Sequence, residues 1–174
     1  MSDSLAISNE MLSNPVGVSA LIISLASLLM TVNLWKRANR PILTARVTTH
    51  SGGSEGIALN LLIENTGNRP ACEVRLRARE RDVRAALVDP TSTQLPSDAR
   101  RCFFSNIIIP VLANGKTASN AFGVLGGEKA TWRSGAKFSV QIRYRGLDGG
   151  TYRSKMILVL SDDAGFAQSF WDAE

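Results

Sequence analysis

Hydrophobic and polar residues are unevenly distributed along this chain, and the first long feature is an uncharged apolar stretch. The 20 positions from Val16 to Trp35 contain no charged residue. As an α-helix rising about 1.5 Å per residue, this stretch would be about 30 Å long, the thickness of a bilayer's hydrocarbon core. A helix satisfies its backbone polar groups internally, as lipid requires. The pattern predicts one transmembrane helix over residues 16–35.

A cleaved signal peptide and a buried core helix are the alternatives to a membrane span. A signal peptide needs a basic leader and a small-residue cleavage site. The leader here carries Asp3 and Glu10 with no Lys or Arg, and Lys36 and Arg37 follow the stretch. Core helices usually show a polar face and are rarely this long without a charge. Both comparisons favour the transmembrane interpretation.

The flanking charges predict the orientation of the helix. Basic residues stay on the cytoplasmic side of a membrane, and Lys36, Arg37 and Arg40 all follow the stretch. Trp35 stands where an interfacial aromatic anchors a helix at headgroup depth. We expect a single-pass protein of the cell (inner) membrane, with a short external segment (1–15), a basic juxtamembrane linker (36–41) and a cytoplasmic C-terminal domain.

Small and hydroxyl residues form a stripe along the predicted helix, at spacings of three and four. Such residues allow close helix approach in lipid and hydrogen bonds across the contact, which would make the protein a homo-oligomer. The alternative is that the hydroxyls bond their own preceding turn, and the sequence leaves both open. The association residues under the first hypothesis are Ala20, Ser24, Ser27, Thr31 and Asn33.

After the linker, the hydrophobic period changes to the two-residue alternation of β-strands, as in Leu59, Leu61 and Ile63. One short helix is expected at residues 81–88, and no long helical pattern follows. The sequence therefore predicts a mainly β protein, with an antiparallel β-sandwich over residues 42–160. Its strands are expected at residues 42–49, 57–64, 72–78, 102–109, 117–124, 138–144 and 152–160.

One strand of this series has a marked two-sided pattern. Cys72, Val74, Leu76 and Ala78 alternate with charged residues, so we expect these four side chains to face the core.

Residues 161–174 form a C-terminal tail, whose aromatic residues Phe166, Phe170 and Trp171 either pack on the domain edge or act as a free peptide motif. Packing on the edge is the favoured interpretation.

The run LNLLIENTGNRPACEVRL, from Leu59 to Leu76, is a strand ending in Asn-x-Gly, followed by a small residue and an alternating strand. This run resembles immunoglobulin-like modules of bacterial surface and membrane proteins, including the CARDB-type group. The turn at Asn114 and Gly115 and the hairpin VQIRYRGLDGGTYRSKMILVL are similar to that group's later segments. The chain also looks like small single-pass bacterial membrane proteins of unknown function. The resemblance implies an immunoglobulin-like sandwich that acts as a binding or spacer module, and it carries over no catalytic residue.

Charge and cysteine usage limit the function classes. The formal net charge is +5, from 20 Lys and Arg against 15 Asp and Glu. This mild excess suits an anionic membrane surface, and it is weaker than a nucleic-acid binder needs, so no nucleic-acid partner is expected.

Cys72 and Cys102 form no CxxC motif, so neither structural zinc nor a disulfide framework is predicted. In the cytoplasm both would be reduced thiols.

No catalytic pattern stands out. His50, the one histidine, lies beside a glycine turn without a partner at a known spacing. The Gly-Gly pairs are accounted for as turns, and Asp162 with Asp163 is a weak metal signal. We expect no enzyme activity and no cofactor.

One group of charged residues stands out. In an immunoglobulin-like order the third, sixth and seventh strands share a sheet, which would gather their basic side chains on one surface, partly offset by Glu73. This surface, called the basic face below, would hold anionic lipid headgroups or dock an acidic partner; the alternative is an ordinary solvated strand face. Its residues are Arg75, Arg77, Arg79, Arg143, Arg145, Arg153 and Lys155.

These observations favour a non-enzymatic, membrane-anchored adaptor that recruits or regulates a protein partner at the cytoplasmic membrane surface, or an accessory subunit of a membrane complex. The alternative hypothesis is a membrane-linked ligand sensor, or a defence or stress effector, that oligomerises through its transmembrane helix. A pocket lined by polar loop residues would favour the sensor, and a flat exposed patch would favour the adaptor.

Overall fold

The computed structural model describes residues 15–53 and 55–162. The predictions for the external segment before Pro15 and for the tail aromatics lie outside these residues. The chain divides into two compact units at the bond between Arg40 and Pro41. The first contains the apolar helix and the second contains a β-sandwich.

Helix α2 spans Pro15–Ala38 and is 24 residues long. At about 1.5 Å per residue its length is about 36 Å, and it is the one helix in the described part of the chain that is long and apolar enough to cross a membrane. It continues three residues past the predicted end at Trp35. Asn39 ends it by donating both its backbone N–H (2.9 Å) and its side-chain amide (3.0 Å) to the carbonyl of Trp35, and Pro41 disfavours further helix.

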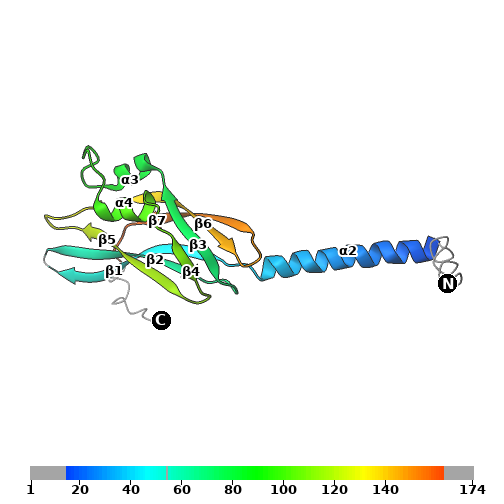
Figure 1. Ribbon diagram of the computed structural model, residues 1–174. Coiled ribbons are helices and arrows are strands. Elements are labelled where there is room, and N and C mark those ends of the chain that lie inside the picture. The colour runs from blue at the N-terminus through cyan, green and yellow to red at the C-terminus, as the bar shows by residue number, and fades with distance from the viewer. Residues whose placement is uncertain (1–14, 54, 163–174) are drawn as a thin grey trace, which may run out of the picture. The chain divides into compact units, whose positions relative to one another are not determined.

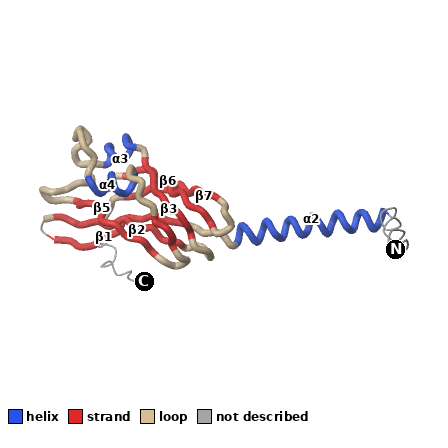
Figure 2. Tube along the Cα trace, in the orientation of Figure 1, coloured by secondary structure: helices blue, strands red, loops and turns tan. Residues whose placement is uncertain are grey.

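The second unit is a sandwich of two antiparallel sheets, so the predicted mainly β fold with an N-terminal helix is confirmed. Sheet A has the order β1-β2-β5 and sheet B the order β4-β3-β6-β7 (Figures 1 and 2). The third, sixth and seventh strands share one sheet, as predicted. The strands are β1 (Leu43–Gly53), β2 (Gly56–Asn65), β3 (Ala71–Ala78), β4 (Ile109–Leu112), β5 (Thr117–Leu125), β6 (Lys137–Gly146) and β7 (Thr151–Val159).

The two open sides of the sandwich are closed differently. On one side β1 lies against β7, where the Ala45 N–H donates to Sδ of Met156 at 2.9 Å. On the other side helix α4 (Ser97–Phe103) contacts β3 of sheet B and β5 of sheet A, so it bridges the two layers. Helix α3 (Glu80–Ala86) packs on β6, close to the helix predicted at residues 81–88.

The strand predicted at residues 102–109 is wrong. Its first part belongs to α4, and the strand in this region, β4, begins only at Ile109. The apolar residues from Cys102 onward fit either period, because a short apolar run does not distinguish a strand from a buried helix turn. The helix is the better solution here, since Ala99 and Phe103, four residues apart, both face the core and are fully buried.

Four aromatic rings fill the centre of the sandwich. The Trp132 ring stacks between Phe122 of sheet A, at a centroid distance of 4.7 Å, and Phe138 of sheet B, at 5.9 Å. Phe103 of α4 meets both phenylalanines edge-on at 5.7 Å. The Trp132 indole N–H donates to the Phe122 carbonyl. Gly123 makes this approach possible, because a β-carbon there would lie 2.8 Å from the indole nitrogen.

Asn65 is the one buried polar residue among the described residues, and it joins the two sheets. Its side-chain amide, at the end of β2, donates to the Leu112 carbonyl of β4 at 3.0 Å and to the Arg69 carbonyl at 2.8 Å. Its side-chain oxygen accepts from the Gly67 N–H at 3.1 Å. One side chain therefore fixes the Asn-x-Gly turn and the crossing from sheet A to sheet B.

Replacing Asn65 with Ala should lower the free energy of unfolding by about 3 kcal/mol, because one buried carbonyl, one partly buried carbonyl and one buried N–H lose the hydrogen bond to its side chain. Urea unfolding of the purified protein, followed by near-ultraviolet circular dichroism, measures this loss. The matched control is Asn68→Ala, at an exposed position in the same turn. Equal effects of the two substitutions would contradict the role of Asn65.

Candidate functional site

Three arginines of the basic face lie in one row across sheet B. Arg75 of β3 is directly opposite Arg143 of β6, and Arg143 is directly opposite Arg153 of β7. Residues opposed in this way place their β-carbons about 5 Å apart on the same face of the sheet. Two like-charge contacts therefore follow one another across three strands. We call this set the arginine row.

The next row toward α3 is also basic. Arg77 is opposite Gln141, which is opposite Lys155, and Arg79 follows the end of β3 at the start of α3. With Asp82, these side chains line a polar hollow of about 480 Å³ on the surface. Asp82 is engaged by Arg81 at 3.2 Å. The hollow therefore keeps a net positive charge.

A β-bulge in β3 determines the other end of the basic face. Glu73 has a backbone φ of 52°, in the left-handed region that non-glycine residues rarely adopt, and the pairing with β6 shifts between Cys72 and Arg75. The extra residue brings the Glu73 carboxylate to 3.2 Å from the Arg145 guanidinium. Arg145 is thus the member of the basic face whose charge is offset.

The same bulge corrects the predicted orientation of Cys72. The alternation expected from Cys72 to Ala78 is broken at Glu73, so Ala71 and Val74 are the buried residues. Cys72 pairs instead with the exposed Arg145 and turns to the outer side of the sheet. Strict two-residue periodicity fails here because one added residue reverses the facing of the residues before it.

The arginine row is a destabilising arrangement for the isolated domain. Within the described residues, none of its three guanidiniums forms an ion pair with an acidic side chain. Like charges directly opposite each other in a sheet are unfavourable. The surface is consequently complementary to a ligand that brings several negative charges in a line.

The helix residues singled out in the sequence lie on an exposed surface of α2. The Thr31 hydroxyl donates to the Ser27 carbonyl at 2.8 Å, and the Ser19 hydroxyl to the Val16 carbonyl at 2.9 Å, so these two bond their own helix. Ala20, Ser24 and Asn33 belong to the same helix, as do the expected interface residues Trp35, Lys36 and Arg37, with Arg40 just beyond its end.

A second concave feature, which the sequence did not reveal, lies between the sheets beside α4. This pocket has a volume of about 250 Å³ and is lined mainly by aliphatic side chains of both sheets. Asn120 donates to Sγ of Cys102 at its wall, at 3.1 Å. Burial raises the pKa of the Cys102 thiol. The sequence feature that could have indicated this pocket is the apolar run at Ile107–Ile109. Ile107 and Ile109 line the pocket, and β4 begins only at Ile109.

Among the residues that the structure describes, no group of three or more His, Cys, Asp or Glu side chains could hold a metal ion. His50 is exposed, but the turn expected beside it is wrong. Strand β1 continues through His50 to Gly53, and Ser51, Gly52 and Gly53 pair with β2 after an irregularity between Thr49 and Ser51.

A family model described as a domain of unknown function, DUF8453, matches residues 10–163. The match spans all of α2 and all seven strands. No curated protein matches the chain.

Replacing Arg143 with Gln should raise the free energy of unfolding by about 1 kcal/mol at low ionic strength, because two like-charge contacts of about 0.2–1 kcal/mol each are removed. The gain should shrink in about 1 M NaCl, where charges are screened beyond about 3 Å. Urea unfolding at the two salt concentrations measures both effects.

Arg145→Gln is the matched control, since it removes an arginine of the same strand that has an acidic partner. It should give no stabilisation. A result in which Arg143→Gln and Arg145→Gln behave alike would show that repulsion in the row is negligible.

Proposed function

We propose that this chain, which belongs to the DUF8453 family of domains of unknown function, is a membrane-anchored, non-enzymatic binding module. In this proposal α2 spans the membrane, the sandwich lies in the cytoplasm, and the basic face docks an acidic protein partner. The arginine row is the observation that carries the docking proposal.

The anchor is supported by the surface of α2. Its large apolar side chains are exposed, including Leu21 at 64% and Ile23 at 66%, and within this fully described helix no residue is buried. Such a surface is unfavourable in water and suited to lipid. A buried core helix does not fit these exposures. The basic residues Lys36 and Arg37 in the last turn support a cytoplasmic location for the sandwich.

The arginine row supports an anionic partner rather than an ordinary solvated strand face. Solvated faces usually mix the two signs of charge, whereas here Arg75, Arg143 and Arg153 are aligned without an acid between them. A partner that supplies carboxylates along this line gains hydrogen-bonded ion pairs and also relieves the repulsion within the sheet.

The composition of the face favours a protein over a lipid surface. Six of its seven cations are arginines, whose planar guanidinium binds carboxylates in a bidentate geometry. Exposed aliphatic side chains accompany them, with Val111 59% exposed and Ile157 66% exposed on the same sheet. Arginine next to apolar surface, with little lysine, is typical of protein interfaces. The resemblance to immunoglobulin-like binding modules agrees with this proposal.

Deleting Pro15–Ala38 should release the protein from membranes. The full chain is expected to stay in the membrane pellet after a carbonate wash, and the deletion variant is expected in the supernatant.

The orientation is tested by labelling Cys72 in a Cys102→Ser background. Cys72 should react with a membrane-impermeant maleimide only after permeabilisation, because the proposal locates the sandwich in the cytoplasm.

The control for orientation is Ser4→Cys in a chain lacking both native cysteines, which should react in intact cells. A full chain recovered in the supernatant would contradict the anchor. Labelling of Cys72 in intact cells would reverse the orientation.

Reversing the charge of the arginine row should abolish docking. A photocrosslinking amino acid at Thr151, opposite Arg145 on the exposed face, is expected to yield a protein adduct of discrete mass in cells. The triple variant R75E/R143E/R153E should lose this adduct, because attraction to carboxylates becomes repulsion. Its three acids repeat the like-charge row, so the cost to the fold is similar to that of the native chain.

The matched control is R46E/R100E/K116E, which changes the net charge equally at positions outside the basic face. It should keep the adduct, and a crosslinker at Thr117 of sheet A should give none. An adduct that survives R75E/R143E/R153E contradicts the proposal. Loss of anionic-liposome binding in that variant, with no protein adduct from Thr151, would identify lipid as the ligand instead.

A further inference from the structure

The pocket beside α4 is a defined opening into the core of the sandwich. Its floor is made of Leu61 and Ile63 of β2 together with Val74 and Leu76 of β3, all of which are at most 8% exposed. These residues belong to opposite sheets, so the pocket lies between the layers. It is found on the side that α4 bridges, where the edge strands β4 and β5 also contact each other.

The walls of the pocket are apolar and partly open to solvent. Ile107, Ile109 and Ala118 line them, and Ile107 is 59% exposed. Protein interiors are normally packed without voids much larger than a water molecule. A space of about 250 Å³ is larger than the cavity of about 150 Å³ that holds benzene in an engineered protein. By the same proportion it admits about ten carbon atoms.

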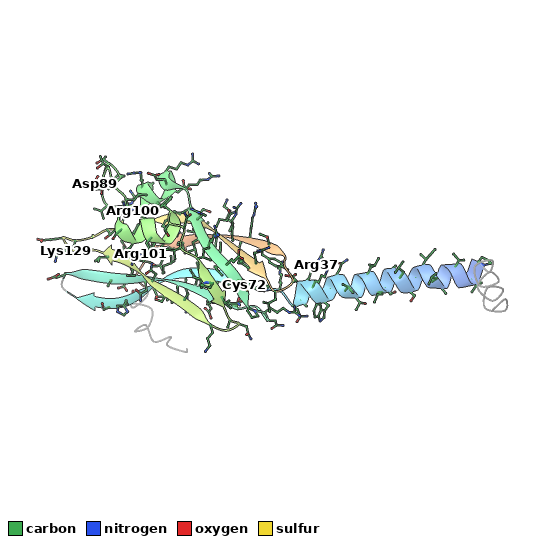
Figure 3. All side chains as sticks on the ribbon, viewed as in Figure 1. Arg37, Cys72, Asp89, Arg100, Arg101 and Lys129 are labelled. Atoms are coloured by element: carbon green, nitrogen blue, oxygen red, sulfur yellow. The ribbon has the colours of Figure 1, made fainter. Side chains whose placement is uncertain are left out.

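The pocket lining includes polar residues and one positive charge. These residues are Arg101 of α4 with Ser119 and Asn120 of β5. Among the described residues no acidic side chain forms an ion pair with Arg101. Figure 3 labels Arg101 and the preceding residue, Arg100. Arg100 is exposed on the same helix and is not part of the pocket lining. The pocket therefore combines an apolar interior with a single cationic guanidinium.

We infer that this pocket binds a medium-chain aliphatic carboxylate, with its hydrocarbon chain between the sheets and its carboxylate on Arg101. The aliphatic floor excludes a strongly polar ligand, because burying polar groups without hydrogen bonds is unfavourable. The guanidinium selects an anion over a neutral or cationic head, since arginine binds carboxylates through paired hydrogen bonds. The inference is independent of the proposed docking function, because the pocket and the basic face share no residue.

Octanoate is the probe, and the reactivity of Cys102 is the measurement. Cys102 lines the pocket beside Arg101, so a bound chain should shield its Sγ from N-ethylmaleimide. The experiment uses the full chain with Cys72→Ser, in lipid nanodiscs. Octanoate at about ten times its dissociation constant should slow alkylation about tenfold and in a saturable way, because only the free protein reacts. Octylammonium should give little protection.

The role of the Arg101 charge is tested by comparing its reversal with reversal of the charge on Arg100. Arg101→Glu should abolish protection by octanoate and make octylammonium the better protector, whereas the matched control Arg100→Glu should keep the native preference. Both positions are exposed on α4, so neither change removes a buried contact. Ala118→Leu, which fills the pocket, should slow alkylation without octanoate and leave no further effect of adding it.

Three results would overturn the inference. The first is no protection of Cys102 by octanoate. The second is equal protection by octanoate and octylammonium in the unmodified pocket, which would reflect partition into the nanodisc. The third is an equal loss of protection in Arg101→Glu and Arg100→Glu, which would show that the net charge of α4 matters and Arg101 itself does not. Each of these leaves the docking proposal untouched.

Discussion

The buried side chain of Asn65 is the interaction on which the rest of the sandwich depends. It holds the Asn-x-Gly turn from within and reaches the carbonyl of Leu112 in the opposite sheet. A sandwich of two sheets has few covalent crossings, and each crossing must place the next strand at the correct height. By fixing the loop before Ala71, Asn65 sets where β3 begins, and the pairing of β3 with β6 then determines which arginines meet.

The two sides of sheet B serve different ends. Its inner side joins the aromatic cluster around Trp132, whose stacking and burial favour the folded state. This packing allows the outer side to keep an unfavourable alignment of Arg75, Arg143 and Arg153. The bulge at Glu73 adds local backbone strain and neutralises Arg145 alone. The distribution of charge over the basic face is thus a product of strand register as well as composition.

The sequence predicted whatever depends on simple periodicity. The uncharged stretch became α2, and the alternation at Leu59, Leu61 and Ile63 became the buried side of β2. It failed where a residue's environment is decided by distant partners. Cys102 and Phe103 became the end of α4 because Phe103 packs between the sheets, and Cys72 turned outward because of a bulge. The basic residues could be named, but their direct opposition required the register, and the pocket required the packing of α4.

Repulsion between the arginines of sheet B would link the binding of a partner to the lifetime of the protein in the cell. A ligand that binds only the folded state raises its stability by mass action. If an acidic partner docks as proposed, it would also offset the repulsion between Arg75, Arg143 and Arg153. A copy with this partner bound would then be more stable than a free copy and would open less often to proteases. Cells would accumulate the chain in proportion to its partner, as they do with subunits that are degraded when left unassembled. The row of Arg75, Arg143 and Arg153 would then match the amount of this protein to the amount of its partner, in addition to forming the contact surface.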